Sequence, residues 1–169
     1  SLTPTGMEPV LKLSVSPSPL EPRSLERRLL SMPPARALNL RLAACDGDSL
    51  CLTAPLAPNI NDKGNAFGGS LASLMTLSAW ALMSMKLEEA GFYPDVYVQD
   101  SKLHYLVPLY DDLRAEARLV VGQSWDQVIA TFAQRGKTRA MLQAQIQDLS
   151  GRICSTLEGR FVALSAKNG

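Results

Sequence analysis

The chain has 169 residues, of which 46% are hydrophobic and 20% charged, and its formal net charge is +1. This length and composition predict one domain with a substantial core. The near-zero charge argues against general nucleic-acid binding, which needs a basic surface.

The first 24 residues are rich in proline and serine and contain no apolar stretch of the kind that a signal peptide needs. They are predicted to form a mobile arm, in which residues 1–6, before Met7, are expected to remain from an expression tag. A single domain is predicted over residues 25–164, followed by a tail at 165–169.

Ser24 can cap a short helix that ends at Pro33-Pro34 and has an apolar face formed by Leu25, Leu29 and Met32. Two strands are predicted next, at about 37–45 and 49–56, because Asp46-Gly47-Asp48 between them is typical of a hairpin turn. The local arginines form either a solvated helix face or a docking patch for phosphates or an acidic carrier protein. They are Arg23, Arg27, Arg28, Arg36 and Arg41.

A long uncharged segment runs from Gly64 to Met85, just after an amide-rich loop at 59–63. It is long enough to cross a bilayer, which takes roughly 20 apolar residues. Against a membrane span, the sequence offers no second such segment, and this one contains the hydroxyl side chains of Ser70, Ser73, Thr76, Ser78 and Ser84. We therefore predict the buried central helix of a globular fold, which continues to about Ala90 and ends at Gly91.

After this helix the apolar pattern changes to a period of two, which predicts strands at about 96–107, 113–121, 138–148 and 152–164. In the first of these strands, Asp100, Lys102 and His104 form a polar face. Ser124-x-x-Gln127 is a capping box that predicts a short helix at about 125–134, ended by Gly136. This order predicts an α+β fold in which antiparallel hairpins wrap one central helix, and it disfavours a doubly wound parallel sheet.

Several kinds of catalytic site are excluded. His104 is the only histidine, so one chain cannot build a two-histidine metal site, and its polar strand face favours a structural or solvated role. Glycine motifs for phosphates or dinucleotides and the nucleophile elbow of hydrolases are absent. The cysteines, Cys45, Cys51 and Cys154, have no metal-type spacing and favour a reduced, cytoplasmic setting. We expect no cofactor and no metal.

The segment Asn61-x-x-Gly64-x-x-Phe67-Gly68-Gly69 leads into the uncharged helix, and Asp100-x-x-Leu103-x-Tyr105-Leu106-x-Pro108 follows that helix. Together with Ala57-Pro58-Asn59-Ile60-Asn61, these motifs resemble the hotdog-fold acyl-thioesterases, in which an Asn-x-x-Gly-x-x-His-Gly-Gly segment begins the central helix. The chain is most similar to the "putative thioesterase" subfamily found as the C-terminal domain of YiiD-type acetyltransferase-like proteins. The resemblance covers about residues 25–164 and implies a hotdog fold, an antiparallel sheet wrapped around a long central helix.

The resemblance also implies water-driven hydrolysis of an acyl-CoA or acyl-carrier-protein thioester. The N–H groups of Gly68 and Gly69 would stabilise the oxyanion, although these glycines could equally serve only close packing. Asn61 would position the water or the thioester carbonyl, and Asp62 is either a general base or an ordinary turn residue. Thr76 would assist from the helix of a partner subunit, because hotdog domains pair into homodimers or larger assemblies such as tetramers.

Further residues are candidates for substrate contact. Asn59 and Phe67 flank the loop, and Ser70 and Ser73 either orient a water or simply pack. An apolar tunnel for the acyl chain would be lined by Leu74 and Met75. Three basic residues could hold the phosphates of coenzyme A, or they could form a solvated strand face. This basic group is Arg135, Lys137 and Arg139.

Two departures from the better-known relatives leave a rival function open. Phe67 stands where they have histidine, and Thr76 stands where they have a carboxylate; no Asp or Glu occurs from Ala66 to Leu87. The rival is a hotdog module that binds acyl thioesters without hydrolysing them. A hotdog dehydratase or hydratase is disfavoured, since such enzymes pair a histidine with a carboxylate near the helix.

Overall fold

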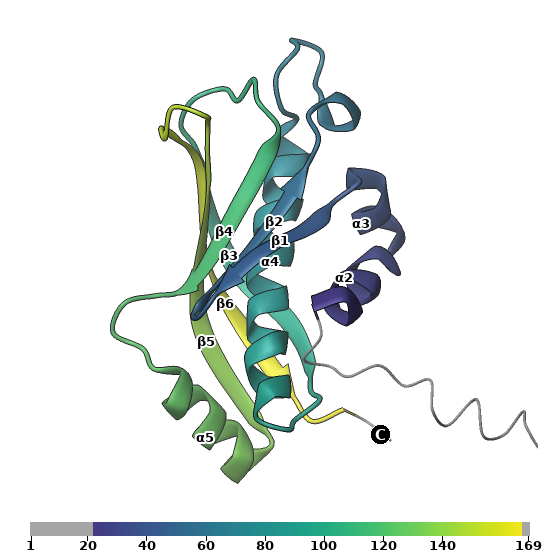
Figure 1. The fold of residues 1–169 in the computed structure, drawn as a ribbon. Helices are drawn as coiled ribbons and strands as arrows, with labels where there is room; N and C mark the ends of the chain where they lie inside the picture. The colour runs from purple at the N-terminus through teal and green to yellow at the C-terminus, as the bar shows by residue number, and fades with distance from the viewer. Residues whose placement is uncertain (1–21, 167–169) are drawn as a thin grey trace, which may run out of the picture.

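The computed structural model describes residues 22–166, which form an antiparallel sheet wrapped around one long helix (Figure 1). The six strands lie in the order β1-β2-β4-β5-β6-β3. Residues 1–21 of the predicted arm and 167–169 of the predicted tail lie outside the described residues. In chain order the elements are α2 (Pro22–Leu30), α3 (Pro33–Leu38), β1 (Arg41–Asp46), β2 (Ser49–Ala54), η1 (Ala57–Asn59), α4 (Gly68–Glu89), β3 (Asp95–Tyr105), β4 (Leu113–Leu119), α5 (Trp125–Arg135), β5 (Lys137–Gln147) and β6 (Ile153–Leu164).

Helix α4 forms the centre of the core, as its uncharged sequence predicted. Leu74, Leu82 and Leu87 are fully buried, and the helix packs on strands β2, β3, β4, β5 and β6. Gly91 follows its end with a φ of 92°, which suits glycine and turns the chain back toward the sheet. Within residues 22–166, none of the helices has the length and apolarity that crossing a bilayer requires.

The sheet has an apolar face toward α4 and a polar face away from it, because strand side chains alternate. In β5, for example, every second residue from Ala140 to Ile146 is buried, and the residues between them are exposed or half-buried. The cap of α5 also follows the prediction. Ser124 accepts a hydrogen bond from the Gln127 N–H, and Gly136 ends the helix in the left-handed conformation.

Strand β3 lies at an edge of the sheet and pairs only with β6 among the described strands. Its predicted polar face is present, but the opposite face is also largely open. On that face, Val98 and Tyr105 are 42% and 55% exposed, whereas Tyr97 lies on the polar face because β3 bulges between Val98 and Asp100. The strand pattern alone did not predict this, because period-two alternation does not reveal whether anything packs on the apolar side.

The N-terminal helices differ from the prediction. Pro33-Pro34 begins a second helix, α3, so residues 37 and 38 are helical and the first strand starts only at Arg41. Proline is well suited to the first turn of a helix, since its missing N–H would have had no partner there. Ser24 lies inside α2 and is buried, so it is not the predicted cap.

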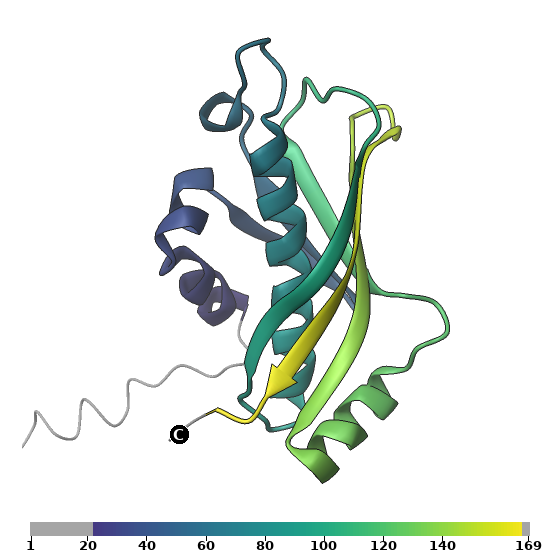
Figure 2. The ribbon, with the colours of Figure 1, turned by 180° about the vertical axis from the view of Figure 1, so that it is seen from behind.

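Helices α2 and α3 lie on one side of α4, and β5 and β6 lie on the other (Figures 1 and 2). Arg28 of α2 forms an ion pair with Glu88, whose side chain is only 3% exposed. The guanidinium also lies over the ring of Trp80, 5.8 Å from its centroid. These contacts attach α2 to the second half of α4.

Candidate active site

The loop between β2 and α4 is held by hydrogen bonds of Asn59, which is 3% exposed. Its Nδ2 atom donates to the carbonyl oxygens of Leu38 and Pro55, at 2.9 and 2.8 Å. The backbone carbonyl oxygen of Asn59 accepts a hydrogen bond from the N–H of Phe67 at 2.8 Å. Both amide hydrogens are therefore used inside the protein, and Asn59 holds the loop in place rather than facing a substrate, contrary to the sequence-based expectation.

Asn61 closes the loop onto Asn65. Its Oδ1 atom accepts the N–H groups of Lys63 and Asn65, at 2.8 and 3.1 Å, and its Nδ2 atom donates to Asn65 Oδ1 at 2.7 Å. Gly64 has a φ of 87°, which explains why glycine stands at the third position after Asn61. Asn61 thus shapes the loop, and one of its two amide hydrogens remains without a partner among the described residues.

Helix α4 starts with two available N–H groups. Ser70 and Leu71 donate their N–H groups to the Phe67 carbonyl, whereas those of Gly68 and Gly69 have no acceptor within residues 22–166. No side chain caps this end. The helix dipole and these free donors favour negative charge here. These two N–H groups are therefore open to an acceptor from outside the described residues.

Two aromatic rings flank the glycine pair. Phe67 is 54% exposed, and its ring leaves no room for a side chain on Gly69. Tyr105, at the end of β3, lies beside Gly68, and its hydroxyl is 3.5 Å from the Gly68 carbonyl oxygen. Tyr110 is also exposed, and its hydroxyl receives a 3.4 Å contact from Asn65 Nδ2. The start of α4 is thus bordered by exposed apolar surface.

The carboxylate nearest in sequence, that of Asp62, is poorly suited to act as a base. It is 82% exposed and accepts a 2.9 Å hydrogen bond from Lys63. The Lys63 ammonium holds the pKa of the Asp62 carboxyl below its usual range, which weakens it as a proton acceptor. Asp100, on β3, forms a 3.0 Å ion pair with Arg160.

The remaining helix candidates are distributed around α4. Leu74 and Met75 are fully buried, and Ser70 is 8% exposed. Ser73 is exposed and Thr76 is half-buried, so these two lie on the side of α4 that the chain leaves partly open. A partner subunit or a ligand could reach that side without rearrangement of the core.

The basic group Arg135, Lys137 and Arg139 lies at the opposite end of the sheet. Lys137 is in register with Leu164, which is in turn in register with Asp95 at the beginning of β3. Tyr105, beside Gly68, ends the same strand, and eleven residues of strand span roughly 30 Å. One chain therefore does not bring this basic group to the start of α4.

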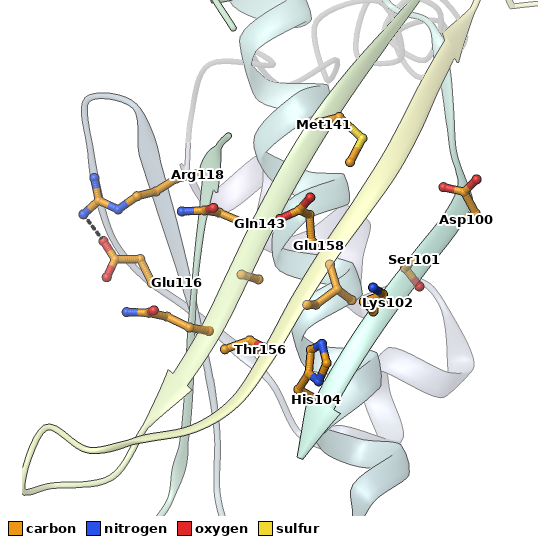
Figure 3. Close-up of a pocket in the computed structure, with 13 residues that line it drawn as sticks. Asp100, Ser101, Lys102, His104, Glu116, Arg118, Met141, Gln143, Thr156 and Glu158 are labelled. Atoms are coloured by element: carbon orange, nitrogen blue, oxygen red, sulfur yellow. Dashed lines mark hydrogen bonds and ion pairs between the residues drawn. The ribbon is translucent and has the colours of Figure 1, made fainter. Parts of the chain in front are cut away.

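A hollow of about 560 Å³ lies on the sheet face opposite α4 (Figure 3). Its lining is mainly polar and comes from four strands. One row of this lining crosses all four strands, each residue in register with the next: Arg118, Gln143, Glu158 and Lys102. His104 is exposed in this hollow, as expected for a solvated histidine. The sheet separates the hollow from the start of α4. Within residues 22–166, no cluster of His, Cys, Asp and Glu side chains could hold a metal ion.

Three residues near the start of α4 were not singled out as site residues from the sequence. Asn65 is the partner of Asn61, and Tyr105 touches Gly68. Ser155 of β6 is in register with Tyr105 and is fully buried. The period-two pattern placed Tyr105 and Ser155 on strands, but their proximity depends on the pairing of β3 with β6.

Comparison with known proteins connects this geometry to a family. The sequence matches the family described as Putative thioesterase (yiiD_Cterm) over residues 23–165. A protein of unknown function from Chlorobaculum tepidum TLS has a similar solved structure, with a TM-score of 0.79 and 27% identity, over 86% of this chain and 94% of that one.

Two further solved structures show the same fold. A "putative thioesterase" from Shewanella oneidensis is 24% identical, with a TM-score of 0.73 over 84% of this chain and 99% of that one. A protein from Pseudomonas aeruginosa described as of unknown function and "Probable Thioesterase" is 22% identical, with a TM-score of 0.73 over 86% and 97% of the two chains. These likenesses confirm the predicted hotdog fold.

Proposed function

This chain belongs to the family described as Putative thioesterase (yiiD_Cterm), and on that premise we propose that it hydrolyses an acyl thioester of coenzyme A or of an acyl-carrier protein. Water would attack the thioester carbonyl carbon, the C–S bond would break, and the products would be a carboxylic acid and a thiol. The proposal depends chiefly on the start of α4, where the N–H groups of Gly68 and Gly69 have no acceptor among the described residues.

These donors suit the oxyanion that forms on the thioester oxygen. Preorganised backbone N–H groups at a helix start stabilise such charge without having to reorient during the reaction. Phe67 and Tyr105, on either side, would shield the bound thioester from bulk solvent while one positioned water attacks it. Asn61 would act as a positioning residue, because its side chain fixes the loop that leads into this helix end.

A homodimer in the cytoplasm is part of the proposal. The outer edge of β3 is unpaired among the described strands, and exposed apolar side chains lie on or beside it, including Tyr97, Val98, Tyr105 and Leu106. An exposed apolar patch and an unpaired edge both favour pairing with another copy. Thr76, on the open side of α4, would then face the substrate held by the partner subunit.

The rival function, binding without hydrolysis, is favoured by one observation. Within α4 the first carboxylate is Glu88, near the far end of the helix, and Asp62 is paired with Lys63. The proposed hydrolysis therefore relies on oxyanion stabilisation and a positioned water, without a strong general base, and we expect turnover to be slow.

Thiol release from a panel of acyl-CoA and acyl-carrier-protein thioesters tests the proposal. Enzyme-dependent release of free thiol supports hydrolysis. Saturable binding of the same thioesters without thiol release supports the rival. If the chain neither releases thiol nor binds these thioesters, both functions are contradicted.

A further inference from the structure

The sheet face that α4 covers consists of rows of side chains that run across the strands. One row contains only apolar residues: Leu50, Ala117, Ala144, Leu157 and Leu103. The next row toward the start of α4 is Leu52, Ala115, Ile146, Ser155 and Tyr105. Ser155 therefore places a hydroxyl in a wall whose other side chains, apart from Tyr105, are apolar, one strand in from the open edge of the sheet.

The hydroxyl of Ser155 has no hydrogen-bond partner among the described residues, and the residue is 0% exposed. A buried polar group without a partner is unfavourable, and most such groups in proteins are satisfied. Ser78 of α4 shows the usual solution, because it is equally buried and donates to the Met75 carbonyl at 2.8 Å. The Ser155 hydroxyl thus keeps an unused hydrogen-bonding capacity inside the core.

Its position connects this hydroxyl to the start of α4. Ser155 is in register with Tyr105, and the ring of Tyr105 lies beside Gly68. Figure 2 shows the start of α4, the end of β3 and the start of β6 at the same end of the molecule. A thioester carbonyl held by the N–H groups of Gly68 and Gly69 would place its acyl group close to this wall.

We infer that Ser155 contacts the substrate and selects acyl groups that carry an oxygen close to the thioester, such as 3-hydroxyacyl or 3-oxoacyl groups. This inference rests on the proposed function. An oxygen on the acyl chain pairs with the Ser155 hydroxyl, whereas a plain hydrocarbon chain leaves it unpaired. Sites built to bond a substrate oxygen reject analogues that lack it, because the protein group then loses its partner.

The test compares hexanoyl-CoA with 3-hydroxyhexanoyl-CoA on the full chain. Thiol release gives kcat/KM for both, and non-hydrolysable thioether analogues of both give dissociation constants. We expect a preference of about tenfold for the hydroxylated compound, as one added hydrogen bond supplies. In Ser155→Ala, the ratio of kcat/KM for the hydroxylated compound to kcat/KM for hexanoyl-CoA should fall until the preference disappears.

Ser78→Ala is the matched control, because it removes a buried serine hydroxyl that already has a partner. It should keep the preference, and thermal unfolding of both variants checks that each is folded. Equal use of the two compounds by the unaltered chain, or a preference that survives Ser155→Ala, overturns the inference while thiol release still supports the proposed function. If the analogues bind without turnover, their dissociation constants decide the same question. Absence of both turnover and binding rejects the inference together with the proposed function.

Discussion

The ring of Phe67 fills the space beside Gly69, so that a Cβ atom on this glycine would lie 2.5 Å from Phe67 Cε2. Such a contact is too close, and the ring would have to move. The neighbouring Gly68 is different, because its Cβ position lies 3.8 Å from Tyr105, an ordinary contact. Of these two glycines, only Gly69 therefore has a steric reason to lack a side chain.

Gly69→Ala should displace the Phe67 ring and lower thiol release by about tenfold, because a displaced flanking group disturbs substrate orientation. Stability should stay the same or rise, since alanine favours a helix over glycine by about 1 kcal/mol. Kinetics and thermal unfolding measure the two effects separately. Gly68→Ala is the matched change and should cost less turnover; a larger loss in Gly68→Ala than in Gly69→Ala would contradict the steric argument.

Asn61→Ala should reduce turnover by about tenfold or more and leave the fold intact. The substitution removes three hydrogen bonds that join Asn61 to Lys63 and Asn65, so the loop before α4 loses its fixed shape. Circular dichroism checks the fold, and separate kcat and KM values locate the defect. Asn61→Asp keeps the acceptor but loses the donor to Asn65 Oδ1. Its turnover should lie between that of the unaltered chain and that of Asn61→Ala. Unchanged turnover in Asn61→Ala would remove this residue from the mechanism.

Gly159→Ala should weaken the attachment of β3. A Cβ atom on Gly159 would meet the Asp100 carbonyl oxygen, the Ser101 Cβ and the Phe161 ring, each at 3.1 Å, where β3 bulges against β6. Overpacking of this kind costs about 1–3 kcal/mol. Thermal unfolding should show the loss, and sedimentation should show fewer dimers. Glu158→Ala, at an exposed position on the same strand, is the control. If the two variants sediment alike, the attachment of β3 does not affect dimer formation.

Asp148 should contribute to stability above its unfolded pKa and not in acid. Hydrogen bonds from the Ser150 hydroxyl and the Arg152 N–H hold the pKa of Asp148 below its ordinary value of 3.8. A lowered folded pKa means that the stabilisation is present above about pH 4 and disappears as pH falls through the folded pKa. The Tm difference between the unaltered chain and Asp148→Ala should therefore shrink from about pH 6 to about pH 3. A constant difference would contradict this.

Local signals in the sequence were sufficient where one segment determines its own structure. The uncharged run predicted α4, and Ser124 with Gly136 predicted both ends of α5. The prediction was wrong at Pro33-Pro34, because proline is compatible with both the end of one helix and the start of the next.

The candidate site was less predictable, because it depends on contacts between distant segments. Asn59 and Asn61 are chemically alike and two residues apart, yet only the three-dimensional fold buries Asn59 against Leu38 and Pro55. Ser155 fits a strand pattern as well as any small residue does. Its significance appears only when strand register places it beside Tyr105 and its hydroxyl is found without a partner.

The two edge strands, β1 and β3, differ in how readily a strand from another chain could pair with them. β1 has only six residues, its register is interrupted between Leu42 and Cys45, and the N–H of Leu42 is taken by the carboxylate of Glu26 at 2.8 Å. Such features block strand addition. β3 is longer, with eleven residues, although its register with β6 is also interrupted, between Val98 and Asp100, and the Val96 carbonyl accepts a 2.8 Å hydrogen bond from Trp80 Nε1. Copies that join through β3 have no second open edge with which to continue, so strand pairing terminates at two chains instead of extending into a fibre.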